Sequence, residues 1–432
     1  MKTVDPSAPG RGSQDGPDEH THRYVPTRDW QFQLNNRTHR IVLVTVVLLL
    51  TATFVYRNWW PFLAGWITYR NKPPDPAVYE RAIKYDPDNA DYHFVLAQLY
   101  NYSTQHLDVA RAGEEYETAA RLNPNRSAHW LELSKFYEQA GDTERARSAL
   151  QKALENDPNW AQMRWAAANF YVRLNDLKSA DLELRRTADL DVSYVNQVLD
   201  LVWRFYEDPE RIMSTHIPNT RGANLVALNY FVTQKSETGA AIAWSKLKTF
   251  QTTQQERLPY VDFLILSGKP HQAWEVFGGG TAPEELFFNG SFETQPLNGG
   301  FDWLFGSRDE ARRDLSVTKS GMASWLIVFD GKENPDFSGL GHWLPLNSGK
   351  RYTLSFWMKT EAISTNEGVF VEVDGQSSEK QVGTTYWRQF TIPFTATSDY
   401  VFVRFRRMPS KKFDNLLKGK VWLDDFVVTE VR

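Results

Sequence analysis

An uninterrupted apolar run near the amino terminus is the strongest feature of the hydrophobic pattern. Residues 41–56 contain no charge, proline or glycine, and residues 57–60 extend the run to two tryptophans. At a rise of about 1.5 Å per residue, a helix over 41–60 is long enough to cross a hydrocarbon core of about 30 Å. An amphipathic core helix would carry polar residues at every turn, whereas only three threonines interrupt this run. The pattern predicts a single transmembrane helix over 41–60, with a buried core helix or a cleaved signal peptide as alternatives.

The residues that flank this run predict its orientation. Aromatic residues that favour the lipid headgroup layer follow it directly, namely Trp59, Trp60, Trp66 and Tyr69. Four arginines lie between residues 20 and 41, against two arginines and one lysine within residues 57–72. Because positive charge is retained on the cytoplasmic side, we expect a cytoplasmic amino terminus and an extracytoplasmic bulk, at the inner membrane of a bacterium. Residues 1–40 are rich in proline, glycine and polar residues, which predicts a disordered tail.

After the apolar run the pattern becomes helical and repetitive over residues 73–277. In the clearest unit, residues 127–158, large residues on a first helix face small residues on a second helix. Its characteristic positions are Trp130, Leu133, Tyr137, Gly141, Ala146, Leu150, Ala153 and Pro158. The large side chains fill the space that the alanines leave, the glycine makes the turn, and the proline ends the second helix. Pro124 precedes Pro158 by 34 residues, which is the length of one such unit.

These positions resemble the tetratricopeptide repeat, closely over residues 75–190 and more weakly to residue 280. Residues 77–87 look like the second helix of a unit whose first helix is missing. The resemblance implies an α-solenoid whose concave face, made mainly by the first helices, takes an extended peptide or a partner helix. The residues that we expect to point to that face are His93, Glu132, Lys135, Arg164 and Asn169. The alternative for each of them is an ordinary solvated helix residue.

The pattern changes again after a glycine-rich linker over residues 278–284. Over residues 285–432, short alternating or apolar runs are separated by Gly, Asn, Asp and Ser. Eight or more such runs predict an antiparallel β-sandwich of the jelly-roll kind. The chain is therefore predicted to be multidomain, with a transmembrane helix, an all-α solenoid and an all-β sandwich.

Four short motifs give this last region a second resemblance. Residues 289–293 (NGSFE), 300–303 (GFDW), 352–359 (YTLSFWMK) and 422–428 (WLDDFVV) are similar in kind and order to carbohydrate-binding jelly rolls of xylanases and cellulases, which have a galactose-binding-like topology. The resemblance implies a glycan ligand and a structural Ca²⁺ held by Glu293 and by Asp424 or Asp425. Strand alternation places Asp424 on the same face as Phe426, so we favour Asp424. The alternative is that the two aspartates only end an edge strand.

Sugar recognition requires aromatic faces that stack on pyranose rings and polar groups that bind hydroxyls. Alternation along three predicted strands places such side chains opposite the apolar face. They are Trp357, Phe370, Glu372, Arg404 and Arg406. If these strand faces form one concave surface, the five residues line a glycan-binding cleft. Trp357 is equally well explained as a core residue of the sandwich.

Composition narrows the function further. The net charge of −4 argues against nucleic-acid binding, and the absence of cysteine excludes disulfides and thiolate chemistry. The nine histidines show no metal-ligand spacing. The sequence has no phosphate-binding glycine loop, nucleophile elbow or recognisable pair of catalytic carboxylates. We therefore expect a protein without enzymatic activity.

Together these features predict a membrane-anchored scaffold that recruits a protein partner through the repeats and binds a polysaccharide through the sandwich, in bacterial envelope or exopolysaccharide assembly. The first alternative is a protein–protein assembly factor, of the secretion or pilus type, with a purely structural sandwich. The second alternative is an envelope polysaccharide hydrolase or lyase.

Overall fold

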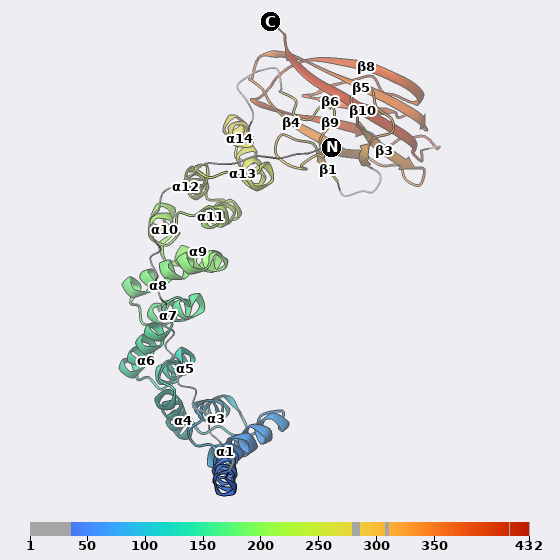
Figure 1. Ribbon diagram of the computed structural model, residues 1–432. Helices are drawn as coiled ribbons and strands as arrows, with labels where there is room; N and C mark the ends of the chain where they lie inside the picture. Colours follow the sequence, from blue (N-terminus) through green and yellow to red (C-terminus); the bar gives the residue numbers. More distant parts are fainter. Residues whose placement is uncertain (1–35, 279–285, 307–310, 414, 432) are drawn as a thin grey trace, which may run out of the picture. The chain divides into compact units, whose positions relative to one another are not determined.

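A computed structural model describes residues 36–278, 286–306, 311–413 and 415–431 (Figure 1). Contacts divide the chain into two compact units, Met1–Pro124 and Asn125–Arg432. The predicted fold class is confirmed, because the helices of a tetratricopeptide-like solenoid precede an all-β sandwich of two sheets. The predicted tail lies outside the described residues up to residue 35, and only Gly278 of the predicted linker is described.

The first unit is built on one long helix. α1 (Arg37–Arg70) contains the apolar run and continues ten residues beyond it. It is followed by α2 (Pro76–Tyr85), α3 (Ala90–Tyr102) and α4 (Val109–Leu122). The end of α1 packs on α2, where the rings of Trp60 and Tyr85 stack with centroids 5.5 Å apart. α1 therefore supplies the first helix that the sequence pattern left missing before α2, because the apolar composition of α1 hid its repeat positions.

The helices of the second unit pair in sequence order. They are α5 (Ser127–Gln139), α6 (Thr143–Asn156), α7 (Ala161–Arg173), α8 (Leu177–Leu190), α9 (Val195–Tyr206), α10 (Pro209–Thr215), α11 (Arg221–Thr233), α12 (Glu237–Leu247), α13 (Gln254–Leu266) and α14 (Pro270–Phe277), with a 3-10 turn at Val192–Tyr194. The pairing continues to α14, far beyond the residues where the repeat signature fades. Buried alanines again lie on the second helices of these late pairs, Ala240 and Ala243 on α12 and Ala273 on α14, among larger apolar residues of the same cluster.

The unit over residues 127–158 shows how the predicted packing positions are used. Leu133, Ala146, Leu150 and Ala153 are buried, and Trp130 and Tyr137 pack at the edge of their cluster. Gly141 turns the chain between α5 and α6 with a φ of +79°, which a residue with a side chain rarely adopts. The Asp142 carboxylate then caps α6 by accepting the Arg145 N–H, and Pro158 follows directly after the helix.

Within the described residues, the sandwich consists of two antiparallel five-stranded sheets that face one another (Figure 1). Its strands are β1 (Leu304–Phe305), β2 (Ala311–Asp314), β3 (Ser324–Asp330), β4 (Phe337–Pro345), β5 (Arg351–Ile363), β6 (Val369–Val373), β7 (Gln376–Ser377), β8 (Gly383–Thr395), β9 (Tyr400–Arg407) and β10 (Lys418–Glu430). We call the sheet of order β1-β4-β9-β6-β7 the first sheet, and the sheet of order β2-β3-β10-β5-β8 the second sheet.

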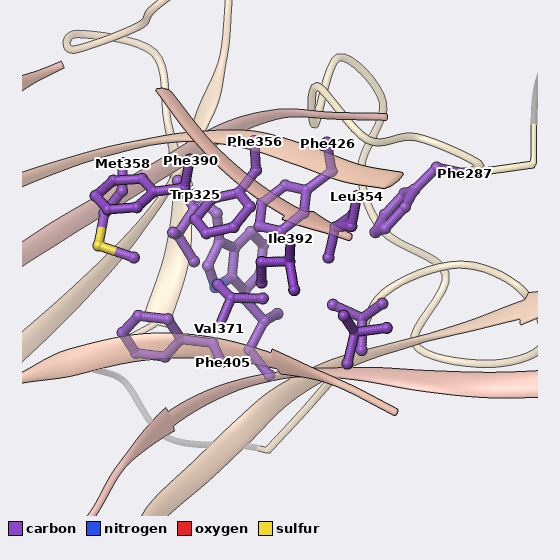
Figure 2. Close-up of a cluster of buried hydrophobic side chains, with 14 of the residues drawn as sticks. Phe287, Trp325, Leu354, Phe356, Met358, Val371, Phe390, Ile392, Phe405 and Phe426 are labelled. Carbon is purple, nitrogen blue, oxygen red and sulfur yellow. The ribbon is translucent and has the colours of Figure 1, made fainter. Parts of the chain in front are cut away.

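Aromatic side chains fill the space between the two sheets (Figure 2). Phe356 of β5 lies between Phe390 of β8 and Phe426 of β10, with ring centroids 5.3 and 5.0 Å away. Val371 of β6 and Phe405 of β9 approach this layer from the first sheet. Alternation along each strand therefore points one set of side chains into a shared core and leaves the other set on the outer face of its sheet.

The sandwich also packs directly on the last helices of the solenoid. Phe301, which precedes the first strand, is fully buried in the helical core and meets Trp274 of α14 edge to face, with centroids 5.1 Å apart. The Gly300 N–H donates to the Asp262 carboxylate of α13 at 2.7 Å. Phe288 packs against Phe277 of α14, with centroids 5.0 Å apart. These contacts, which we call the junction, make the solenoid end and the sandwich one continuous apolar body.

Candidate partner groove and sandwich surfaces

A groove lies between the first helices of two successive repeats in the second unit. Its volume is about 180 Å³, and most of its lining comes from α5 and α7. Leu131, Leu150 and Phe170 give it an apolar floor, and all three are buried. Lys135 and Asn169, two of the residues predicted for the concave face, line the same groove.

The rim of the groove is charged, and its charges are already paired. Lys135 donates to Glu132 at 2.6 Å, so these two predicted residues lie together. Arg173 of α7 holds Glu138 of α5 through two bonds of 2.6 and 2.9 Å, which bridge the two helices. An apolar floor beside paired charges can accept one apolar side chain while the rim binds backbone polar groups of the same segment.

His93 and Arg164, the other two residues predicted for the concave face, are buried instead. Arg164 of α7 donates to the Pro158 carbonyl and to Glu183 of α8, both at 2.9 Å. His93 of α3 contacts the Pro87 carbonyl and Glu115 of α4 in the same way. Burial lowers the pKa of His93, but the bonds to Glu115 and to the carbonyl outweigh burial and raise it overall. Both side chains therefore tie a repeat to the end of the preceding helix rather than face a partner.

Four of the five predicted glycan-binding residues lie together on the outer face of the first sheet. Phe370 and Glu372 of β6 are paired in register with Arg406 and Arg404 of β9. Arg406 approaches Glu372 at 3.9 Å and Asp336 at 3.2 Å. Arg404 is exposed. The patch thus combines a nearly buried ring with two guanidinium groups and one carboxylate, which are groups that can bind sugar hydroxyls or acidic sugars.

The other end of the same face was not foreseen from the sequence. Trp343 of β4 packs on Phe402 of β9 with ring centroids 4.5 Å apart. Trp343 and Tyr400 also pack against the helical core at the junction. The solenoid therefore covers one end of this face and leaves the Arg404 end open. Alternation could have placed these rings on the outer face, but no local pattern shows that helices cover them.

Trp357 does not join this patch, because β5 belongs to the second sheet. The ring lies on the outer face of that sheet, opposite the core residue Phe356. The Lys319 ammonium group sits 4.2 Å from the centre of the ring. The expectation of one cleft lined by all five residues is therefore corrected: strand alternation gives the face of each residue but not the sheet to which its strand belongs.

The predicted calcium ligands hold one loop from both sides. Asp424 accepts the backbone N–H groups of Lys319 and Ser320, at 2.9 and 3.3 Å. Glu293 accepts the N–H groups of Met322 and Ala323, at 2.9 and 3.3 Å, and Asp425 accepts the Ser320 hydroxyl. Burial, helped by the charge of Asp425, raises the pKa of Asp424 to about 6.

The Ca²⁺ site itself stays a prediction. The described residues contain no group of three or more His, Cys, Asp or Glu side chains placed to hold a metal ion. Both Asp424 oxygens and one Glu293 oxygen accept backbone N–H groups, four of which belong to the loop at residues 319–323. Direct hydrogen bonds tether this loop to Glu293 and to β10.

Comparison with known proteins agrees with the repeat geometry. The family described as "Tetratricopeptide repeat" matches residues 105–169. The chain carries tetratricopeptide repeats. Tetratricopeptide repeat protein 37 of Xenopus laevis is 31% identical over 124 residues, which are 28% of this chain and 8% of that protein. Superkiller complex protein 3 of Mus musculus is 31% identical over 105 residues, 24% of this chain and 7% of the relative.

The chain thus covers less than a tenth of the length of these relatives. Among solved structures, that of the MamA protein is 15% identical and covers 41% of this chain and 85% of the other, with a TM-score of 0.27. The residues of this chain that match the family, 105–169, include most of the groove lining, because the lining residues between 131 and 169 fall within that range. The repeats therefore mark this region as a surface for protein–protein interaction.

Proposed function

We propose that this chain is a membrane-anchored, non-enzymatic scaffold that recruits a protein partner through the groove between α5 and α7. The groove carries the proposal, because it joins an apolar floor to a polar rim on the first helices of adjacent repeats. A partner in extended conformation would place one apolar side chain against Leu131 and Phe170. Its backbone groups would then meet Lys135 and Asn169 at the rim.

Photo-crosslinking tests this proposal on the full chain in cells. A photoreactive amino acid at Lys135 is expected to capture one defined protein, because that position lines the groove. The same amino acid at Gln151, an exposed position on α6, is the matched control and should capture none. The substitution Trp165→Ala in the groove lining should abolish capture from position 135. Equal capture from positions 135 and 151, or capture that survives Trp165→Ala, would contradict the proposal.

The anchor in this proposal is α1. Among the described residues it is the one helix long and apolar enough to cross a membrane, and none of its most apolar window is buried. The excess of arginines before the apolar run supports a cytoplasmic amino terminus. We therefore place α1 in the inner membrane of a bacterium, with the repeats and the sandwich outside the cytoplasm, in envelope or exopolysaccharide assembly.

The glycan site in this proposal is the Arg404 end of the outer face of the first sheet. Its guanidinium groups favour an acidic polysaccharide, because each can bind a carboxylate through two parallel hydrogen bonds. The variant Arg404→Ala/Arg406→Ala is expected to weaken binding on a glycan array at least tenfold. Arg388→Ala, on the second sheet, is the matched control and should bind like the native chain. Equal binding by both variants would exclude this face as the glycan site.

One observation favours a second candidate function, in which the sandwich is purely structural. The junction buries Phe301 and Phe277 and partly buries Trp274, so the sandwich covers the apolar end that a solenoid must protect from water. In that case the chain is a protein–protein assembly factor. No glycan binding by the native chain, together with intact partner capture at position 135, would select this candidate.

A further inference from the structure

An aromatic stripe runs along the exposed side of α1, directly after the apolar run. Trp59, Phe62, Trp66 and Tyr69 recur at intervals of three and four residues, so they share one face of the helix. All four remain between 46% and 75% exposed. The opposite side of the same segment is packed, with Ala64 fully buried and Thr68 half-buried. This segment therefore has two distinct faces: one packs on the first repeat, and the other is aromatic and exposed.

The packed side belongs to the first repeat. Trp60 stacks on Tyr85 of α2, although 41% of its surface stays exposed. Gly65 passes close to the Tyr92 hydroxyl of α3: a Cβ there would lie 3.7 Å from it. The stripe consequently has a fixed direction, because rotating it would pull the packed face away from α2 and α3.

Two cations border the far end of the stripe. The Arg70 guanidinium lies 4.6 Å from the centre of the Trp66 ring, and the Lys72 ammonium lies 5.5 Å from that of Tyr69. Aromatic rings with adjacent cations match the layer where lipid headgroups meet the hydrocarbon. Pro61 lies at the start of the segment and removes one hydrogen bond of the helix, so bending is easiest there.

We propose that the aromatic stripe inserts into the headgroup layer of the membrane that α1 crosses, and that it holds the first repeat against the membrane surface. The inference rests on the proposed anchoring of α1. Continuity decides the occupant, since the stripe lies on the same unbroken helix as the apolar run and begins where that run ends. The repeat is then fixed to the span without an intervening flexible linker, and its orientation to the membrane follows from that of the helix.

The absence of cysteine allows a direct test with single spin labels on the full chain. Four variants are needed: Leu49→Cys in the apolar run, Phe62→Cys and Tyr69→Cys in the stripe, and Glu114→Cys on the exposed side of α4 as the control. Each is labelled and placed in nanodiscs of phosphatidylethanolamine and phosphatidylglycerol. Power saturation then compares collisions with oxygen, which enters lipid, and with a nickel chelate, which stays in water.

We expect oxygen to dominate at positions 49, 62 and 69, most strongly at 49, and the nickel chelate to dominate at 114. Adding Trp59→Ser and Trp66→Ser should make position 69 accessible to the chelate while position 49 stays in lipid. If position 49 is in lipid but 62 and 69 behave like 114, the stripe is not in the membrane and the inference fails alone. Positions 62 and 69 shielded from both reagents would show that another protein covers the stripe, which also overturns it. An aqueous position 49 would overturn the anchoring itself.

Discussion

At the scale of single residues, buried polar side chains connect successive repeats at positions where the repeat pattern specifies no residue type. Arg164 and His93 each lie six residues after a proline and reach back to the carbonyl of that proline. Each also binds an acidic residue on the second helix of its own repeat. Because the three partners belong to separate helices and turns, one side chain fixes the angle at which consecutive helices meet.

Arg164→Ala is therefore expected to lower the free energy of unfolding by roughly 3 kcal/mol, because it leaves Glu183 buried without its main partner. The double variant Arg164→Met/Glu183→Leu should recover most of that loss, since it removes both charges and keeps the volume. Arg173→Ala is the matched control. Its side chain is more than half exposed in the ion pair with Glu138, so its loss should lower the free energy of unfolding by about 1 kcal/mol or less. Urea unfolding measures all three, and equal losses for Arg164→Ala and Arg173→Ala would contradict the expectation.

A buried histidine makes the sandwich sensitive to acid. His342 of β4 is fully buried, its ring stacks on Phe287 at 4.0 Å, and one ring nitrogen contacts the Phe288 carbonyl. Burial lowers the pKa of His342 from 6.5 to about 4, although hydrogen bonds to backbone groups oppose that shift. The imidazole is therefore neutral in the folded chain at neutral pH, and protonating it would place a charge in the core.

The sign of the pH dependence follows from this lowered pKa. Stability linked to His342 is complete above pH 6.5 and is lost as the pH falls toward 4, by about 3 kcal/mol over that interval. In His342→Phe the free energy of unfolding should be flatter between pH 6.5 and 4 than in the native chain. Urea unfolding at a series of pH values gives both slopes. His216 has a pKa lowered mainly by burial and adds a slope of the same sign to both proteins, so only the difference is informative. Identical slopes would exclude His342 as the acid-sensitive group.

At the scale of elements, the sequence predicts best what repeats. The alternation of large and small residues over 127–158 predicted the helix pair, because close helix packing requires small residues such as Ala146 and Ala153 at the contact. The pairs after α8 were harder to foresee, since large residues such as Phe231 and Tyr260 join the buried alanines at their contacts. Strand alternation predicted the faces of Phe370 and Arg404, and it failed for Trp357 only because sheet membership depends on pairing between distant strands. The junction could not be predicted for the same reason, because it depends on contacts between distant segments. There Phe301 and Trp303, two residues apart, enter two different cores.

Gly239 shows how closely the two helices of a late pair pack. It lies on α12 against Phe231 of α11, where an added Cβ would come 2.3 Å from a carbon of the ring. Phe231 is fully buried and cannot move aside. Replacing a glycine inside a helix by alanine ordinarily stabilises it by about 1 kcal/mol, whereas Gly239→Ala should destabilise the chain by about 2 kcal/mol through the clash.

Gly65→Ala on α1 is the control for this prediction, since its Cβ would meet only the Tyr92 hydroxyl, at 3.7 Å. That variant should leave stability unchanged or raise it slightly. Thermal unfolding of the full chain in detergent compares the two substitutions. A melting temperature for Gly239→Ala at or above that of the native chain would show that the helices separate easily, and that α11 and α12 are less tightly packed than the contacts indicate.

At the scale of the whole molecule, the two compact units divide at Pro124 and not at the glycine-rich linker. A boundary in the sequence is therefore not a boundary in the packing: the sandwich belongs with the repeats that precede it. Phe301 is part of the helical core, and Trp343 and Tyr400 of the sandwich pack against the same cluster. A partner in the groove between α5 and α7 and a glycan on the first sheet would thus be held on one body.

Hydrogen exchange can test whether the junction stabilises both of its sides. Phe301→Ala should remove about 3 to 5 kcal/mol of packing from the helical core, so the amides of α13 and α14 are expected to exchange faster while those of β5 and β10 keep most of their protection. Phe292→Ala is the matched control, because Phe292 is equally buried but stacks on Trp303 inside the sandwich, with centroids 4.6 Å apart. It should expose the sandwich strands and spare the two helices. Unchanged protection of α13 and α14 in Phe301→Ala would mean that the solenoid end is stable without the sandwich, and the case for the sandwich as a structural cap would then be lost.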